Sequence, residues 1–356
     1  MAVFFNETTK KWYCKFYYTD YKGNKKQKKK SGFKLKREAK DWETEFLSKQ
    51  QEDVDMLFSS FLELYFEDMS HRLRETTVSN KKFMINAKIL PFFGKLKLSE
   101  IKSTHVRKWQ NQLIAYTDQN GKHYTETYIK TLNNQLVAIF NYAVKYYDLK
   151  ENPCTKAGTV GKKHAEEMEF YTLEEFNKFI AAINEHDIQS RTIFTTLYWT
   201  GMRIGELLAL TAKDIDLESN TININKSLQR LEGKDIITPP KTPKSKRVIN
   251  IPVRLNECLT IYLKGLYGLK SNHRIFTYNR QHLRRVLHNA SIQAEVKEIR
   301  LHDFRHSHAS LLIELGCSPL LIAERLGHEK VETTLNTYSH LYPSKQEEIV
   351  SKMDNL

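Results

Sequence analysis

Two segments in the second half of the chain place basic side chains where they could act on a phosphate. The segment TGMRIGEL holds Arg203 and Glu206 three residues apart, which is about one turn of a helix. The segment PPKT places Lys241 in a loop that leads into a predicted strand, and Lys244 and Lys246 follow in the same loop. Taken alone, an arginine and a glutamate at this spacing are most often a surface ion pair.

Two further segments add histidine, arginine and tyrosine. LHDFRHSHAS places His302 and Arg305 on one face of a helix, and LGHEKVETTLNTYSHL places His328 ten residues before Tyr338. Each feature has an ordinary structural explanation when taken alone. A histidine and an arginine at this spacing often cap or pack a helix, and a lone tyrosine is often partly buried with its hydroxyl bonded.

The combined set suits attack on a phosphodiester. A tyrosine hydroxyl is a nucleophile when a neighbouring group helps to remove its proton. Two guanidinium groups can stabilise the charge on the phosphate oxygens, and a lysine can protonate the leaving 5′ oxygen. Because arginines supply the positive charge, we expect neither a metal nor another cofactor. The five histidines His302, His306, His308, His328 and His340 do not change this, since no carboxylate or cysteine completes a ligand spacing such as HExxH.

The composition is that of a basic protein rich in helix. The chain has 356 residues, with 56 Lys and Arg against 42 Asp and Glu, and a formal net charge of +14. A protein with such an excess of positive charge usually binds a polyanion, and nucleic acid is the first candidate. Only 13 Gly and 8 Pro argue against collagen-like or turn-rich β chains. The four cysteines form no CxxC pair, and no long apolar run occurs, so we expect a cytoplasmic protein without a membrane span.

Residues 1–50 are predicted to form a small strand-rich DNA-binding module. They carry 14 basic and 6 acidic residues, a net charge of +8. Aromatic and polar residues alternate from Trp12 to Tyr18, which predicts strands, and the segment LKREAKDWETEFLSKQQ has helical spacing. Aromatic residues beside the lysine run favour DNA binding over a solvated face. The candidate DNA-binding residues here are Lys25, Lys26, Lys28, Lys29 and Lys30.

Residues 53–152 are predicted to form a helical bundle. Apolar residues recur at helical spacing within 57–66, and further helices are predicted over 76–90, 103–116 and 125–147. A bundle that exposes lysines on one side could clamp a duplex, although an ordinary bundle with solvated lysines explains this segment nearly as well. The candidate DNA-binding residues here are Lys81, Lys82 and Lys108.

The remaining residues divide into a linker, a larger domain and a tail. The polar segment 153–169 is predicted to be a linker, and a catalytic domain is expected over 170–343. This domain begins at a capping signature, Thr172 followed by Glu175, and contains a strand-forming interlude between helical stretches. Residues 344–356 are predicted to form a helical tail. The expected fold class is therefore multidomain and mainly α, with a strand-rich N-terminal module and a mixed α/β catalytic domain.

The motifs TGMRIGEL, PPKT, LHDFRHSHAS and LGHEKVETTLNTYSHL resemble those of the tyrosine recombinase, or phage integrase, family, and they occur in the family's order. The resemblance implies that Arg203 and Arg305 clamp the scissile phosphate. It implies that Tyr338 attacks to form a 3′-phosphotyrosyl intermediate and that Lys241 protonates the 5′ oxygen.

The same resemblance assigns three supporting roles. His302 would assist proton transfer with Tyr338, and His328 would hydrogen-bond the phosphate. Glu206 would orient these side chains without contacting the phosphate itself. Every member of the family's catalytic set is present in this sequence. The resemblance therefore implies an active enzyme.

The architecture also resembles that of integrases carried by temperate phages and conjugative transposons of Gram-positive bacteria. Residues 1–50 are similar to their arm-binding domain, and residues 53–152 to their helical core-binding, SAM-like domain. The resemblance implies integration and excision of a mobile DNA element through a Holliday junction, without metal or ATP. It further implies a homotetramer on double-stranded attachment sites of core and arm type, nucleoid association when DNA is bound, an excisionase and a host DNA-bending protein. The tail 344–356 would pack on a neighbouring subunit or fold back on its own domain.

Two other functions remain open from the sequence. A type IB topoisomerase uses similar chemistry as a monomer, but the arm-like module and the compact tail count against it. A DNA-binding regulator that keeps the fold without catalysis is disfavoured by the complete catalytic set. Holliday-junction products would exclude the topoisomerase, and a covalent protein–DNA adduct would exclude the regulator.

Overall fold

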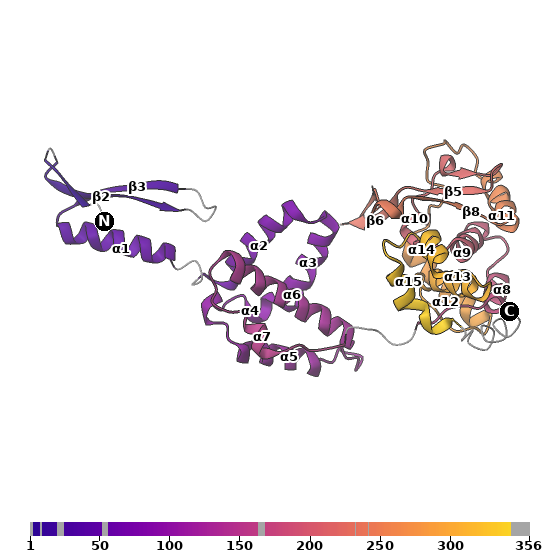
Figure 1. Cartoon of the computed structure of the whole chain (residues 1–356), viewed down its shortest axis with the longest axis horizontal. Helices are drawn as coiled ribbons and strands as arrows, with labels where there is room; N and C mark the ends of the chain where they lie inside the picture. The colour runs from indigo at the N-terminus through magenta and orange to yellow at the C-terminus, as the bar shows by residue number, and fades with distance from the viewer. Residues whose placement is uncertain are drawn as a thin grey trace, which may run out of the picture. The chain divides into compact units, whose positions relative to one another are not determined.

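A computed structural model describes residues 3–7, 9–19, 25–51, 56–162, 168–231, 233–240 and 242–342. By its internal contacts the chain divides into two compact units, Met1–Ala165 and Glu166–Leu356 (Figure 1). None of the helices in the described ranges combines the length and the apolar character that a membrane span requires.

The first unit begins with a three-stranded antiparallel sheet that is packed against α1 (Lys36–Gln51). The strands, in sheet order, are β1 (Val3–Asn6), β2 (Lys11–Thr19) and β3 (Lys25–Phe33). Successive side chains of a strand point to opposite faces, and Phe16 is buried where its ring lies 6.2 Å from that of Trp42 in α1. The predicted strand-rich module with one helix is confirmed.

A helical bundle follows in the same unit. Its elements are α2 (Phe58–Arg72), α3 (Glu75–Lys88), α4 (Leu90–Phe93), the 3-10 turn η1 (Leu98–Glu100), α5 (Ser103–Ala115), α6 (Glu126–Tyr146) and α7 (Pro153–Ala157). The four helices predicted from periodicity are confirmed. Aromatic side chains fill the core, where the Phe93 ring lies 5.7 Å from those of Phe58 and Trp109.

The segment predicted as a linker starts later than expected. Residues 153–157 form α7, where Cys154 and Ala157 are buried in the bundle's core. Gly158 is held as well, because its carbonyl accepts a hydrogen bond from Gln110 Nε2 at 2.9 Å. The polar composition of the segment does not indicate this packing, because only the short helix α7 contributes buried side chains to the bundle.

The second unit consists mainly of helices. They are α8 (Leu173–Ala182), α9 (Ile188–Thr200), α10 (Ile204–Leu207), α11 (Val253–Lys264), α12 (Arg280–Gln293), α13 (Asp303–Glu314), α14 (Pro319–Leu326) and α15 (Val331–Tyr338), with 3-10 turns η2 (Ala212–Asp214), η3 (Pro243–Ser245) and η4 (Ser339–Leu341). The Thr172 hydroxyl and the Glu175 carboxylate cap the start of α8 reciprocally, as the capping signature predicts.

The strand-forming interlude between these helices is also confirmed. An antiparallel sheet contains, in order, β4 (Ile215–Asp216), β5 (Thr221–Ile224) and β8 (Arg247–Asn250). A separate hairpin contains β6 (Ser227–Leu231) and β7 (Lys234–Thr238).

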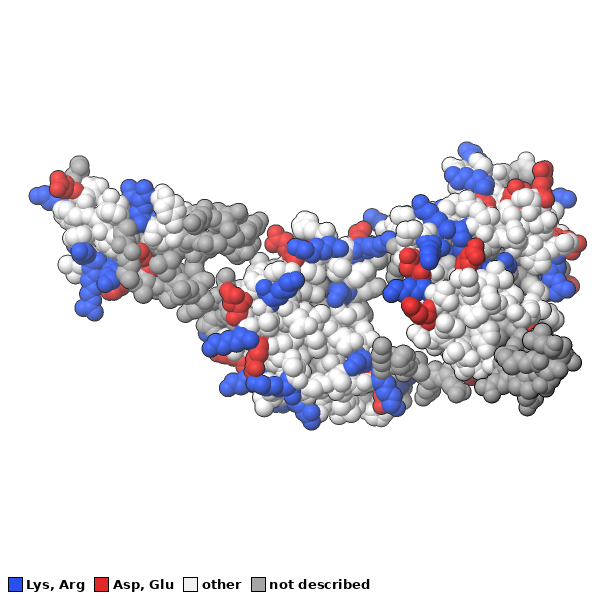
Figure 2. Space-filling view, in the orientation of Figure 1, with Lys and Arg blue, Asp and Glu red and all other residues white. Residues whose placement is uncertain are grey.

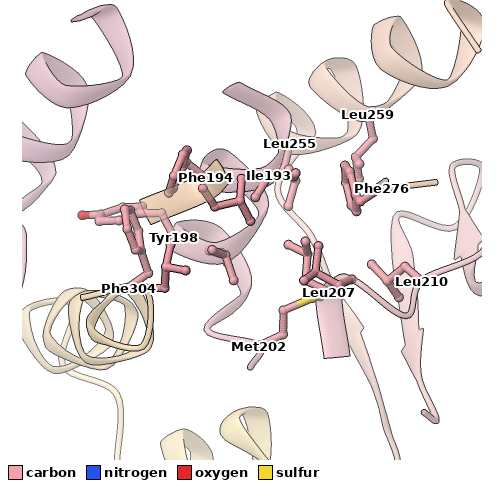
Figure 3. Packing of buried hydrophobic residues seen from close by; sticks show 14 of the residues in the cluster. Ile193, Phe194, Tyr198, Met202, Leu207, Leu210, Leu255, Leu259, Phe276 and Phe304 are labelled. Carbon is pink, nitrogen blue, oxygen red and sulfur yellow. The ribbon is translucent and has the colours of Figure 1, made fainter. Parts of the chain in front are cut away.

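The core of the second unit lies around α9 and α13 (Figure 3). Phe304 of α13 places its ring 5.2 Å from that of Phe194 in α9 and 5.7 Å from that of Phe179 in α8. These rings are fully buried. Helix α13 is therefore fixed by its apolar side chains, and its polar side chains are held in place with it.

We expect Phe179→Ala to lower the free energy of unfolding of the second unit by about 3–5 kcal/mol, because it leaves a cavity among three aromatic rings. Denaturant unfolding followed by tryptophan fluorescence measures this loss. Ile261→Ala is the matched control, since Ile261 is 64% exposed on α11. Equal effects of the two substitutions would contradict the packing described here.

Candidate active site

Arg203 and Glu206 contact each other as their spacing predicts. Arg203 immediately precedes the short helix α10, and its Nη1 donates to Glu206 Oε1 at 2.8 Å. The backbone N–H of Arg203 donates to the other carboxylate oxygen at 2.9 Å. Glu206 is only 3% exposed whereas the Arg203 side chain is 38% exposed, so a buried carboxylate holds an arginine that opens to solvent, which differs from the surface pair that such a spacing usually indicates.

A second arginine, Arg247, which no sequence motif indicated, binds the same carboxylate. Arg247 at the start of β8 donates from Nη2 to Glu206 Oε2 at 3.1 Å and from Nε to the carbonyl oxygen of Arg325 at 2.8 Å. Burial alone would raise the pKa of Glu206, but the charges of Arg247 and Arg203 outweigh it and lower that pKa. Glu206 is therefore an anion that faces two guanidinium groups.

Arg305 is the most deeply placed cation of the set. It is 3% exposed, and its Nη1 donates to the carbonyl oxygen of Gly201 at 2.9 Å. Its Nη2 is buried and has no hydrogen-bond partner among the described residues. Burial and the neighbouring charge of Arg203 lower the pKa of Arg305 to about 9, so it remains a cation at neutral pH. A buried cationic N–H group without an acceptor is costly, and a bound anion would relieve that cost.

His328 stands beside the arginines on the turn after α14. Gly327 precedes it with a φ of +69°, a conformation that glycine adopts without strain. His328 Nδ1 lies 2.7 Å from the hydroxyl of the buried Thr334, which leaves Nε2 to meet a ligand. Burial, with the charges of Arg305 and Arg203, lowers the pKa of His328 to about 4, so the ring is neutral at pH 7.

Tyr338 is the last residue of α15 and is 1% exposed. Burial raises the pKa of its hydroxyl to about 12, although the charge of Arg305 acts in the opposite direction. His302 was expected to assist proton transfer with Tyr338, but the Tyr338 hydroxyl lies 2.7 Å from Nδ1 of His306. His302 is exposed at the start of α13, with its ring 5.3 Å from that of His306.

Lys241 and the tail 344–356 lie outside the described residues. The loop that contains Lys241 is described on either side of it. There Lys244 Nζ donates to the carbonyl oxygen of Glu329 at 3.1 Å, which ties this loop to the turn that holds His328.

Strand alternation divides the lysines of the N-terminal sheet between its two faces. Phe16 is buried on the face that α1 covers, and its cross-strand partner is Lys28, so Lys28 and Lys30 lie on that face. Lys29 pairs with Lys15 on the opposite face. The side chains of the other two candidates lie outside the described part of the structure; they are Lys25 and Lys26.

The candidate lysines of the bundle differ in their surroundings. Figure 2 shows Lys and Arg side chains on the visible face of the bundle. Lys81 is half-buried and donates to Gln135 Oε1 at 2.6 Å, so it contributes to the bundle itself. Lys82 and Lys108 are exposed, and Lys108 lines an open hollow together with Arg107.

The arrangement in the second unit suits one anion. Glu206 contacts both Arg203 and Arg247, and a Cβ on Gly327, the residue before His328, would lie 2.9 Å from Arg247 Nη1. The charge of Arg305 also acts on His328, and Glu206 offsets only part of the positive charge. Across the described ranges no cluster of three or more histidine, cysteine or acidic side chains could hold a metal ion. The geometry therefore supports the binding of a phosphate group near a tyrosine hydroxyl.

Comparison with known protein families covers most of the chain. A model described as the phage integrase family matches residues 169–345. The phage integrase N-terminal SAM-like domain matches residues 57–114, and an arm DNA-binding domain matches residues 4–50. The ICEBs1 integrase of Bacillus subtilis (strain 168) is 33% identical over 315 residues, which cover 84% of this chain and 83% of that protein.

Solved structures show the same fold at lower identity. The Tn1549 transposon integrase in complex with a circular intermediate DNA matches with a TM-score of 0.67 and 19% identity, over 83% of this chain and 98% of that one. A lambda integrase tetramer bound to a Holliday junction matches with a TM-score of 0.60 and 18% identity, over 92% and 95%.

We expect Glu206→Gln to lower the unfolding free energy of the second unit at pH 7 by about 3 kcal/mol, because the buried guanidinium group of Arg247 loses its counter-charge. The pKa of Glu206 is lowered in the folded state, so its contribution is present above the ordinary carboxyl pKa and is lost as the pH falls through the folded value. Denaturant unfolding from pH 7 downwards should show the gap to wild type narrowing in acid. Glu218→Gln, at an exposed position, is the control; a gap that is constant with pH would contradict this reading.

Proposed function

Because the chain belongs to the phage integrase family of tyrosine recombinases, which cleave and rejoin DNA strands, we propose that it integrates and excises a mobile DNA element through a 3′-phosphotyrosyl intermediate. The observation that carries the proposal is the buried Nη2 of Arg305, which meets no hydrogen-bond partner in the described part of the chain and lies one residue before His306, the side chain that contacts the Tyr338 hydroxyl. Family membership already makes the chain an integrase of mobile elements; the residue roles are the proposal.

In the cleavage step the scissile phosphate binds between Arg203 and Arg305, and His328 Nε2 contacts a phosphate oxygen. The Tyr338 oxygen forms a bond to phosphorus as the bond from phosphorus to the 5′ oxygen breaks. The phenol gives its proton to a histidine at the start of α13, and Lys241 supplies a proton to the departing 5′ oxygen. The guanidinium groups stabilise the charge on the transferring phosphate.

The rejoining step is the reverse of cleavage. The tyrosyl ester conserves the energy of the broken phosphodiester, so exchange needs neither ATP nor a metal. A free 5′ hydroxyl from the partner duplex attacks the ester, and two such exchanges form and resolve a Holliday junction. Four active sites are required, so we propose a homotetramer on two duplexes; the fold shared with the lambda integrase tetramer supports this assembly. An excisionase and a host DNA-bending protein remain predictions.

Tyr338→Phe should abolish a covalent protein–DNA adduct while preserving packing and DNA binding. Nicked duplexes from the flanks of the element that carries the gene would be incubated with protein and resolved on a denaturing gel. Tyr342→Phe is the matched control, because Tyr342 lies four residues further on and its hydroxyl contacts the carbonyl oxygen of Cys317. An adduct with Tyr338→Phe, or none with wild type on DNA that it binds, would refute the proposal.

The arm module offers a second test with an internal control. We expect replacement of Lys15 and Lys29 by Gln to reduce the dependence of log K on log salt at arm-type sites by about 2, because two phosphate contacts are lost. Replacement of Lys28 and Lys30, which have the same charge but lie on the face that α1 covers, should change it less. Filter binding across a salt series measures both slopes, and equal slopes would show that the open face is not the binding face.

A further inference from the structure

The hydroxyl of Tyr338 and the imidazole of His306 form a hydrogen-bonded pair inside the second unit. The Tyr338 oxygen lies 2.7 Å from His306 Nδ1, within the usual range of a hydrogen bond. Tyr338 is 1% exposed and His306 is 9% exposed, so bulk water has little access to the pair. A proton that leaves this phenol therefore has a neighbouring acceptor in the imidazole.

Two different elements bring the pair together, which makes the contact a product of the fold. His306 lies in the first turn of α13, and Tyr338 ends α15, 32 residues later. The aliphatic side chains of Ile322 and Leu326 from α14 belong to the same buried cluster as Tyr338. The Tyr338 ring is thus held by packing before any ligand arrives, and the hydrogen bond holds the buried His306 beside it.

We infer that His306 is a further catalytic residue, the general base that takes the proton of Tyr338 through Nδ1 as the tyrosine attacks the phosphate. The inference rests on the proposed role of Tyr338 as nucleophile. As the bond from oxygen to phosphorus forms, the O–H bond breaks and the proton moves to Nδ1, which leaves an imidazolium. The departing 5′ oxygen takes its proton from a separate donor, and the imidazolium returns its proton to the phenol when the ester is resolved.

The surroundings of His306 favour the form that this role needs. Burial lowers the pKa of His306 to about 4, and the charges of His302, Arg305 and Arg300 act in the same direction, while Asp303 opposes them. The ring is therefore neutral at pH 7, which is the form that can accept a proton, but its low pKa makes it a weak base in the free protein. A phosphate that binds Arg305 offsets that positive charge, so proton uptake becomes more favourable when the substrate is in place.

His306→Asn separates proton uptake from simple hydrogen bonding, because the amide oxygen can accept the hydrogen bond but cannot take up the proton. We expect single-turnover cleavage of a nicked core-site duplex at pH 7 to fall about 100-fold or more. Between pH 7 and 9 the variant should gain about tenfold per pH unit, as the tyrosinate fraction rises below the phenol's raised pKa. Wild type should be nearly independent of pH over this range.

His340→Asn is the matched control, since His340 is exposed two residues after Tyr338. Thermal melting and duplex binding establish that His306→Asn is folded, and His306→Gln carries the same test if it is not. A variant as fast as wild type, or one slowed equally at every pH, would overturn the base assignment while a wild-type adduct on Tyr338 still stands. The absence of that wild-type adduct would instead refute the proposed function, and this inference with it.

Discussion

One buried carboxylate organises the positive charge of the site. Glu206 accepts hydrogen bonds from Arg203 with both of its oxygens, and Arg247 binds the second of them. The carboxylate offsets only part of the charge of the guanidinium groups that surround it, and burial together with the charge of Arg203 lowers the pKa of Arg305. Repulsion is thus built into the free protein, and a bound phosphodiester would relieve it. A second carboxylate in the site would therefore stabilise the free chain but weaken its affinity for DNA.

The backbone also fixes the position of Arg305. Gly201 ends α9 with a φ of +61° and offers its carbonyl to Arg305. A Cβ at this position would lie 2.7 Å from atoms of both His308 and Leu326, so α9, α13 and α14 meet at a point where only glycine fits. The position of Arg305 therefore depends on the close packing of three helices, and the aromatic core around Phe304 keeps that packing fixed.

The helices, the strand interlude and the family could be predicted from the sequence because their signals are local. Periodic apolar residues mark α6, the capping signature marks α8, and four short motifs mark the family. The contacts that Arg247 and His306 make could not be predicted, for a physical reason. Arg247 meets Glu206 from 41 residues away, and several histidines in one segment offer no local sign of which one faces Tyr338. The burial of α7 could not be predicted because the residues that follow it in the sequence are polar. The contacts that bury it form only in the folded bundle.

The burial of Tyr338 gives the proposed nucleophile a second role as a packing residue. Its ring belongs to a small cluster with Ala309, Ile313, Ile322 and Leu326, which is separate from the main core of the second unit. A small cluster loses a large share of its buried surface when one aromatic ring leaves. Moving the Tyr338 oxygen out of the site into solvent, away from His306, therefore requires local unfolding, and the opening free energy of α14 and α15 sets how often this happens in a free subunit. Local stability thus keeps the hydroxyl within hydrogen-bond reach of His306, and hydrogen exchange measures that stability.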